Sequence, residues 1–237
     1  FGNPIEAFQK SLNDILSYEK DISAIGVTGS ARQLIGNLLQ ATIIKNELTA
    51  HAAATTHFFP EVRTIIEIGG QDSKLIFLEK GKIIDFALNN LCAAGTGSFL
   101  EQQANRLNIS LDEFSENAFQ AEDKVNISGK CTVFAESDMI HYQQLGVEKS
   151  FILFGLCLAM ANNYISELAK GKEIKAPIVF QGGVSKNKGM LKAFEYILNK
   201  KISIPPNSEV LGAYGSAKLA FDNKKEEKCF TKFADLL

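Results

Sequence analysis

Three short apolar runs, each ending in a glycine-containing turn, constrain the fold of this 237-residue chain most strongly. Apolar runs of four to eight residues bounded by turn residues predict buried strands. Helical patterns separate the runs, so we predict an α/β fold whose ligands bind at the loops beyond the strand ends. Neither a P-loop nor a GxGxxG fingerprint is present, so the common nucleotide motifs are absent. The runs are 22–27, 64–68 and 177–181, followed by Thr28-Gly29-Ser30, Gly69-Gly70-Gln71-Asp72 and Gly182-Gly183.

The segments between these runs predict the remaining elements. Ile5, Phe8 and Leu12 recur at helical spacing and indicate an amphipathic helix from Pro4 to about Tyr18. Lys80-Gly81 joins two apolar runs, 74–78 and 82–86, and predicts a hairpin. By the same criteria we expect helices at 31–39, 46–59 with Asn46 as N-cap, 151–170, 188–198 and from 212 onward, and a short strand at 202–204.

Composition indicates a folded chain with a substantial core, since 46% of residues are hydrophobic, 22% are charged and the net charge is -2. Nothing in this balance points to nucleic acid. We find no apolar run close to the roughly 20 residues needed to cross a bilayer. The opening Phe1-Gly2-Asn3-Pro4 lacks the order of a signal peptide. We therefore expect a cytoplasmic protein without a membrane partner.

The four cysteines lack the density of a disulfide scaffold, which fits a reducing compartment. Cys157 lies in an apolar run and is predicted to be core, whereas Cys229 lies in a charged tail and is predicted to be incidental. Cys92 and Cys131 each stand just ahead of a predicted helix, whose apolar positions include Phe99 and Leu100 for the first and Val133, Phe134, Met139 and Ile140 for the second.

A helix N-terminus favours an anion, so it lowers the pKa of a thiol and suits a metal-bound thiolate. The alternative for Cys92 and Cys131 is that each is a small buried residue, the commonest role of a free cysteine. Two thiolates are too few for a metal or iron–sulfur centre, which usually takes about four protein ligands. A symmetric dimer would supply the other pair, which gives the hypothesis of one cluster held by two subunits.

The strand–Gly-Gly–strand segment at Gly69-Gly70 allows backbone amides to approach a phosphate closely. An ordinary tight hairpin turn is an equally good interpretation of that segment alone.

Five segments together resemble the activators of 2-hydroxyacyl-CoA dehydratases, which group with the ATPase subunits of benzoyl-CoA reductase in the actin, hexokinase and heat-shock-chaperone ATPase superfamily. The resemblance covers nearly the whole chain, and its cysteine segments are not found in other members of that superfamily. The segments are Glu67-Ile68-Gly69-Gly70-Gln71-Asp72-Ser73-Lys74, Cys92-Ala93-Ala94-Gly95-Thr96-Gly97, Cys131-Thr132-Val133-Phe134-Ala135-Glu136-Ser137, Gly182-Gly183-Val184 and Gly212-Ala213-Tyr214-Gly215.

The resemblance implies two ribonuclease-H-like lobes with ATP or ADP and Mg²⁺ between them. It also implies a homodimer that holds one 4Fe-4S cluster through Cys92 and Cys131 of each subunit. ATP would drive one low-potential electron, supplied by reduced ferredoxin or flavodoxin, into a 2-hydroxyacyl-CoA dehydratase or a related reductase. We expect a first lobe at 1–90, a second at 91–222 and a tail at 223–237.

The resemblance also assigns site residues. Glu67 and Gln71 would be catalytic, with Glu67 orienting magnesium or water. Glu136 is a weaker candidate for a polar role between the lobes. Glu47 and His51, one turn apart, also match the family, although a structural histidine is the simpler interpretation. The nucleotide would be bound by Gly69, Gly70 and Gln71 as the second phosphate loop, Gly182 and Gly183 on the adenosine side, and Gly212 and Gly215 in a connecting helix.

One departure from the family is large. Its first strand and its glycine- and threonine-rich first phosphate loop have no counterpart here, and the chain opens without methionine. We therefore expect a first lobe truncated at its N-terminus, half a phosphate site, and weak or absent nucleotide binding by this chain alone. The segments look most like the activator part of very long fused proteins.

Two other functions stay open at this point. A sugar or acid kinase of the same superfamily would need a carboxylate base near the phosphate loops, and no Asp stands in an unambiguous place for it. A non-catalytic binding domain would keep Cys92 and Cys131 in its core.

Overall fold

The computed structural model describes residues 4–18, 22–89, 95–129 and 132–224. Its contacts divide the chain into two compact units, one formed by Phe1–Phe58 with Val210–Leu237 and the other by Phe59–Glu209. This division differs from the expected boundaries at 90 and 222. The physical reason is pairing: the strands that follow residue 59 share a sheet with strands near residues 180 and 202, while the last helix packs on the first unit.

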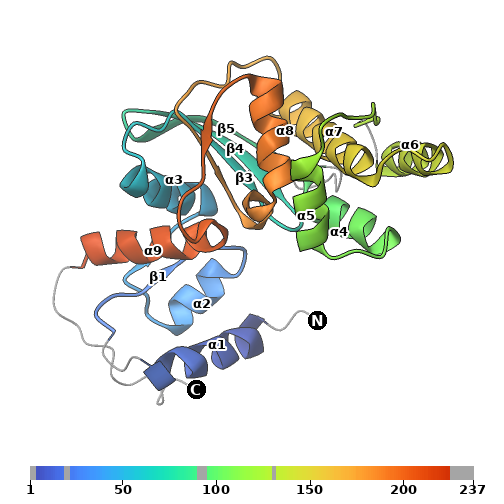
Figure 1. Ribbon diagram of the computed structural model, residues 1–237. Coiled ribbons are helices and arrows are strands. Elements are labelled where there is room, and N and C mark those ends of the chain that lie inside the picture. The colour runs from blue at the N-terminus through green and yellow to red at the C-terminus, as the bar shows by residue number, and fades with distance from the viewer. Residues whose placement is uncertain (1–3, 19–21, 90–94, 130–131, 225–237) are drawn as a thin grey trace. The chain divides into compact units, whose positions relative to one another are not determined.

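The first unit is mainly helical. It contains α1 (Pro4–Tyr18), α2 (Arg32–Leu38), α3 (Glu47–Phe58) and α9 (Leu211–Asp222), with β1 (Gly26–Val27) and β2 (Ile43–Ile44) paired in parallel (Figure 1). The helices match the predicted ones closely, and Asn46 caps α3 by accepting a hydrogen bond from the Thr49 amide at 2.8 Å. The strand expected at 22–27 is shorter, because only Gly26 and Val27 meet a partner strand, and β2 was not predicted.

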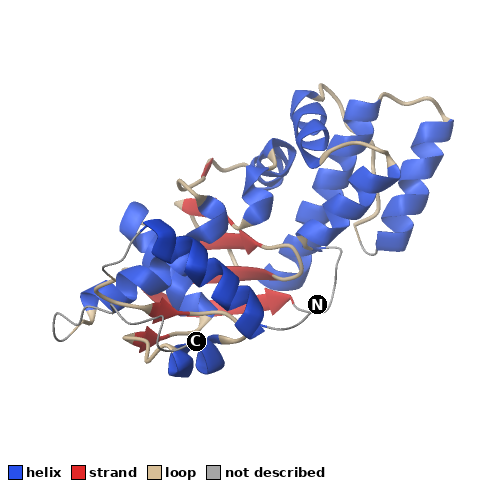
Figure 2. Cartoon of the chain, turned by 90° about the horizontal axis from the view of Figure 1, so that it is seen from below, coloured by secondary structure: helices blue, strands red, loops and turns tan. Residues whose placement is uncertain are grey.

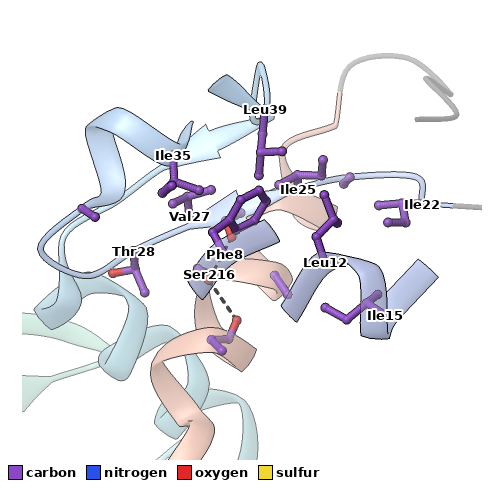
Figure 3. A pocket seen from close by; sticks show the side chains of 15 residues that line it. Phe8, Leu12, Ile15, Ile22, Ile25, Val27, Thr28, Ile35, Leu39 and Ser216 are labelled. Carbon is purple, nitrogen blue, oxygen red and sulfur yellow. Dashed lines mark hydrogen bonds between the residues drawn. The ribbon is translucent and has the colours of Figure 1, made fainter. Parts of the chain in front are cut away.

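A small apolar core holds this unit together. Leu12 of α1 packs with Ile35 and Leu39, and Phe8 and Ile25 cover their edges (Figure 3). The same side chains line an apolar pocket of about 490 Å³.

Close packing joins α3 to α9. A Cβ atom at Gly215 would lie 1.8 Å from the carbonyl oxygen of Ala50, so only glycine permits this crossing. At Gly212 a Cβ atom would make ordinary contact with His51, at 3.4 Å. Of these two glycines, Gly215 is therefore the one that the packing of α9 on α3 requires.

The second unit is built on a five-stranded mixed sheet with the order β5-β4-β3-β6-β7. Strand β3 pairs antiparallel with β4 and parallel with β6, which pairs parallel with β7. Figure 2 shows the strands in one layer with helices beside them. The strands are β3 (Thr64–Ile68), β4 (Ser73–Glu79), β5 (Lys82–Asn89), β6 (Ile178–Gln181) and β7 (Ile202–Ser203).

In the part of the chain that the structure describes, five α-helices of this unit contribute side chains to its large core. Figure 1 shows where these helices lie along the chain. Lys80 and Gly81, at φ 50° and 74°, form the predicted hairpin turn between β4 and β5. The helices are α4 (Gly97–Arg106), α5 (Leu111–Gln120), α6 (Thr132–Gln144), α7 (Lys149–Ala169) and α8 (Lys188–Leu198). Two short 3₁₀ turns follow strands: η2 (Gly183–Lys186) lies between β6 and α8, and η3 (Ser208–Val210) lies between β7 and α9.

Helix α7 is the centre of that core. Among the described residues, it alone is long and apolar enough to cross a membrane. However, 67% of its apolar stretch is buried inside the fold. Its neighbours are α5, α6, α8 and the sheet. Cys157, predicted as a core residue, is fully buried on this helix, and burial raises the pKa of its thiol.

The four apolar positions that indicated helix α6 differ in burial. Met139 is buried, but Val133 and Phe134 are 63% and 61% exposed and Ile140 is also exposed. Helix α6 contacts α7, so a single row of side chains that includes Ala135 and Met139 is enough to seat it.

Candidate functional site

The loop 69–72 lies between β3 and β4 at the carboxyl end of β3. The Gly69 amide donates to the Asp72 carbonyl oxygen at 3.0 Å, which closes the loop into a tight turn. A Cβ atom at Gly70 would meet nothing within 4 Å, and Gln71 is exposed. Within the described residues, neither Gly70 nor Gln71 donates its amide to a backbone carbonyl. Successive amides at such a turn suit a phosphate group.

Glu67 stands on β3 directly before this loop and is only 5% exposed. Its antiparallel partner on β4 is Lys74, whose ammonium lies 3.0 Å from Glu67 Oε2 and 2.8 Å from Asp72 Oδ2. Burial disfavours the charge on Lys74, but the attraction of Glu67 and hydrogen bonds to both carboxylates outweigh it and raise the pKa of Lys74. Lys74 therefore stays protonated and links Asp72 of the loop to Glu67 of β3.

Tyr164 of α7 also contacts Lys74. Its hydroxyl group donates to the Lys74 carbonyl oxygen at 2.6 Å. The ring is buried, and burial raises the pKa of the hydroxyl well above its ordinary value, so Tyr164 remains a donor.

The second glycine loop, 182–187, is packed against the end of β3. Gly182 has φ 87°, and a Cβ atom there would lie 2.3 Å from the Ile68 carbonyl oxygen and 2.9 Å from Glu67 Oε1. Its amide donates to the Ser208 carbonyl oxygen at 2.9 Å, and the Ser185 hydroxyl donates to the Gly182 carbonyl oxygen at 2.7 Å. Glu67 thus lies between the two predicted loops, which the fold brings together.

We expect Gly182→Ala to destabilise the protein by about 2–4 kcal/mol, because alanine meets both a glycine-only backbone conformation and a backbone clash. Gly183→Ala is the matched control in the same loop: a Cβ atom there would meet nothing within 4 Å, so we expect a change below about 1 kcal/mol. Urea unfolding of the two variants checks this. Equal stabilities would show that the loop is not seated on β3.

A pocket of about 340 Å³ opens between the two loops and the starts of α4 and α5. Leu100, Leu111 and Val184 give it apolar walls, and Gly70 also lines it. Such a pocket can take a flat apolar ring while the loop amides receive phosphate oxygens. It is lined by Gly70, Gly97, Leu100, Glu101, Leu111, Asp112, Ser115, Gly183, Val184, Lys186 and Asn187.

Sequence reasoning missed the contribution of α5 to this pocket. The pattern Ser110-Leu111-Asp112-Glu113 was the available signal, since Ser110 accepts a hydrogen bond from the Glu113 amide at 3.0 Å and caps the helix. Ser115 of α5 accepts from the Lys188 amide at 2.8 Å, which ties α5 to the start of α8.

Other predicted site residues belong to the first unit, make other contacts within the second, or lie outside the described residues. Gly212 and Gly215 belong to α9 of the first unit, as Glu47 and His51 belong to α3, and their functional roles stay predictions. Glu136 pairs at 2.6 Å with Arg106, which lies in the same unit. Cys92, Cys131 and Cys229 lie outside the described residues, but α4 begins at Gly97 and α6 at Thr132, close behind the first two.

Comparison with known proteins identifies the family and the fold of this chain. The chain matches the BadF/BadG/BcrA/BcrD ATPase family over residues 5–220. It is 38% identical over 222 residues to the activator of lactoyl-CoA dehydratase from Anaerotignum propionicum, covering 93% of this chain and 84% of that protein.

Two solved structures are similar as well. Component A of the Acidaminococcus fermentans (R)-2-hydroxyglutaryl-CoA dehydratase superposes with a TM-score of 0.84 at 33% identity, covering 93% of this chain and 86% of the other. The activator of 2-hydroxyisocaproyl-CoA dehydratase from Clostridium difficile, with bound ADPNP, gives 0.81 at 33% identity, covering 92% and 81%. These matches confirm the predicted α/β ATPase fold and the resemblance to dehydratase activators. The chain belongs to the BadF/BadG/BcrA/BcrD ATPase family.

Proposed function

We propose that this protein is an ATP-dependent activator that passes a low-potential electron from a 4Fe-4S cluster to a 2-hydroxyacyl-CoA dehydratase or a related reductase. The observation that carries the proposal is the pocket between the loops 69–72 and 182–187, which borders the start of α4. The family membership supports ATP as the ligand, and the names of the relatives support a dehydratase as the partner.

In this proposal the nucleotide binds to the second unit. It replaces the earlier expectation of weak or absent binding from half a phosphate site, because the pocket adds apolar walls to the loop amides. The amides of Gly70 and Gln71 receive phosphate oxygens, and the pocket walls at Leu100 and Val184 receive the adenosine part. The strands keep the two loops in register, and Lys74 neutralises Glu67 so that this buried carboxylate does not repel the phosphates.

The described carboxylates fit Mg²⁺ poorly. Glu67 and Asp72 share the Lys74 ammonium, and the described residues contain no group of three or more His, Cys, Asp or Glu arranged to hold a metal. We infer that Mg²⁺ enters with the nucleotide, held by phosphate oxygens and water, as it often is. The catalytic roles of Glu67 and Gln71 stay predictions.

The electron would travel through iron held by Cys92 and Cys131. When bound, a 4Fe-4S cluster supplies one-electron chemistry at low potential, and it takes about four thiolates. Two copies of this chain would provide them across a twofold axis, with reduced ferredoxin or flavodoxin as the donor. Nucleotide binding then biases the dimer between two arrangements, as a ligand with different affinities for two states does.

The test is activation of a purified 2-hydroxyacyl-CoA dehydratase under anaerobic conditions. The protein, reconstituted with iron and sulfide, is mixed with the dehydratase, a one-electron reductant and ATP. We expect dehydration only when ATP, the reductant and the protein are all present. ATP-dependent phosphorylation of a sugar panel without any dehydratase activation would contradict the proposal and favour a kinase.

A further inference from the structure

The start of α4 is capped by the loop 69–72 rather than by a side chain. The first amides of a helix have no partner within the helix. Thr96, at the N-cap position, makes no side-chain capping bond. Instead the Gly97 amide donates to the Gly69 carbonyl oxygen at 2.9 Å and the Ser98 amide donates to the Gly70 carbonyl oxygen at 2.8 Å. The Ser98 hydroxyl group donates to the same Gly70 oxygen.

Steric contact reinforces this capping. A Cβ atom at Gly97 would lie 3.0 Å from the Gly69 carbonyl oxygen, 3.0 Å from Val184 Cγ2 and 3.3 Å from Gly70 Cα. The first turn of α4 is therefore pressed against both loops of the candidate nucleotide site, and it cannot keep this position if either loop moves.

The geometry of the peptide group connects the two sides of the loop. A trans peptide group is planar, with its carbonyl oxygen and its N–H pointing in opposite directions. The Gly69 carbonyl and the Gly70 N–H belong to one such group, and the Gly70 carbonyl and the Gln71 N–H belong to the next. An anion bound to these amides fixes and polarises the same peptide groups that cap α4.

A displacement at the start of α4 can be transmitted along the helix to α6. Phe99, Leu100 and Ala104 are each 2% exposed, so the helix is set firmly in the core. At its far end Arg106 pairs with Glu136 of α6 at 2.6 Å. Helix α4 follows Cys92 in the sequence, and helix α6 follows Cys131.

We propose that Ser98 is a positioning residue: its hydroxyl group and the peptide groups of Gly69 to Gln71 relay the presence of a phosphate in the loop to the first turn of α4. The inference rests on the proposed function, because it assumes that this loop binds the nucleotide. It adds the route by which the nucleotide reaches the helix that follows Cys92.

Hydrogen exchange followed by mass spectrometry tests the relay without needing the cluster. The protein and the variant Ser98→Ala are compared with and without ADP or a non-hydrolysable ATP analogue, and ADP affinity is measured by calorimetry. In the unsubstituted protein we expect nucleotide to slow exchange at the start of α4 about tenfold or more. In Ser98→Ala we expect ADP affinity within about threefold and protection of the loop 69–72 retained, but protection of α4 reduced to about threefold or less.

Two further variants sharpen the comparison. Ser98→Thr keeps a hydroxyl group and should restore the response of α4. Ser11→Ala removes a hydroxyl group that donates to a helical carbonyl at 3.1 Å in the first unit, and should leave the response unchanged.

The outcomes separate the two proposals. Full protection of α4 in Ser98→Ala overturns the role of Ser98. Protection of both loops without any at the start of α4 in the unsubstituted protein overturns the relay while leaving nucleotide binding intact. No nucleotide-dependent protection anywhere overturns both the relay and the proposed nucleotide site.

Discussion

Cys92→Ala and Cys131→Ala are each expected to abolish iron–sulfur cluster binding. A pair of chains with either change would offer two thiolates in place of the four that such a cluster usually takes. After anaerobic reconstitution with iron and sulfide, the brown absorbance and the bound iron should both be lost, while ADP binding should remain.

Cys229→Ala is the matched control for this pair, since Cys229 lies in the charged end of the sequence and is predicted to be incidental. It should bind as much iron as the unsubstituted protein. If iron bound equally well after both Cys92 and Cys131 were replaced, the hypothesis of a shared cluster would have to be abandoned. A nucleotide-binding protein without an electron-transfer role would remain.

Lys74→Met is expected to lower the free energy of unfolding by about 3–5 kcal/mol, because it strands a buried carboxylate. The side chains of Lys74 and Glu67 are both only 6% exposed, and the ammonium also serves Asp72. Since the raised pKa keeps Lys74 charged, its contribution is present below the ordinary lysine pKa and is lost only as the pH rises through the raised value. The loss in the variant should therefore be constant through neutral pH, as urea unfolding would show.

The fold offers an exposed ion pair for comparison. Lys172 Nζ and Asp85 Oδ2 lie 2.5 Å apart, with both side chains 45% exposed, so Lys172→Met should destabilise the protein far less than Lys74→Met. The double variant Lys74→Met with Glu67→Gln should recover part of the loss, because the unpaired charge is then removed. A Lys74→Met variant as stable as Lys172→Met would contradict the electrostatic role assigned to Lys74.

Much of the fold was predictable because local patterns and tertiary packing agree. The five residues of β3 are all buried and three of them are isoleucines, so this strand was predicted to the residue. The strand β1 was overestimated, because its length depends on how far β2 runs beside it, and β2 itself has only two residues, Ile43 and Ile44. Pairing between strands distant in sequence is not visible in a local pattern.

The candidate site was predictable in part for a similar reason. Gly69, Gly70 and Gly182 were predicted as site residues because they follow predicted strands. The fold places their loops around Glu67. The ion pair of Glu67 with Lys74 depends on the register of the antiparallel pairing between β3 and β4, which cannot be predicted from the local sequence pattern. The capping of α4 by Gly69 and Gly70 depends on a contact across 28 residues of chain, as for Ser98 and Gly70.

Native mass spectrometry of the reconstituted protein under anaerobic conditions tests the central claim most directly. A cluster shared between copies of this chain predicts a dimer that carries a single 4Fe-4S cluster and a monomer that carries none. A cluster on every monomer, or a dimer without iron, would contradict the account.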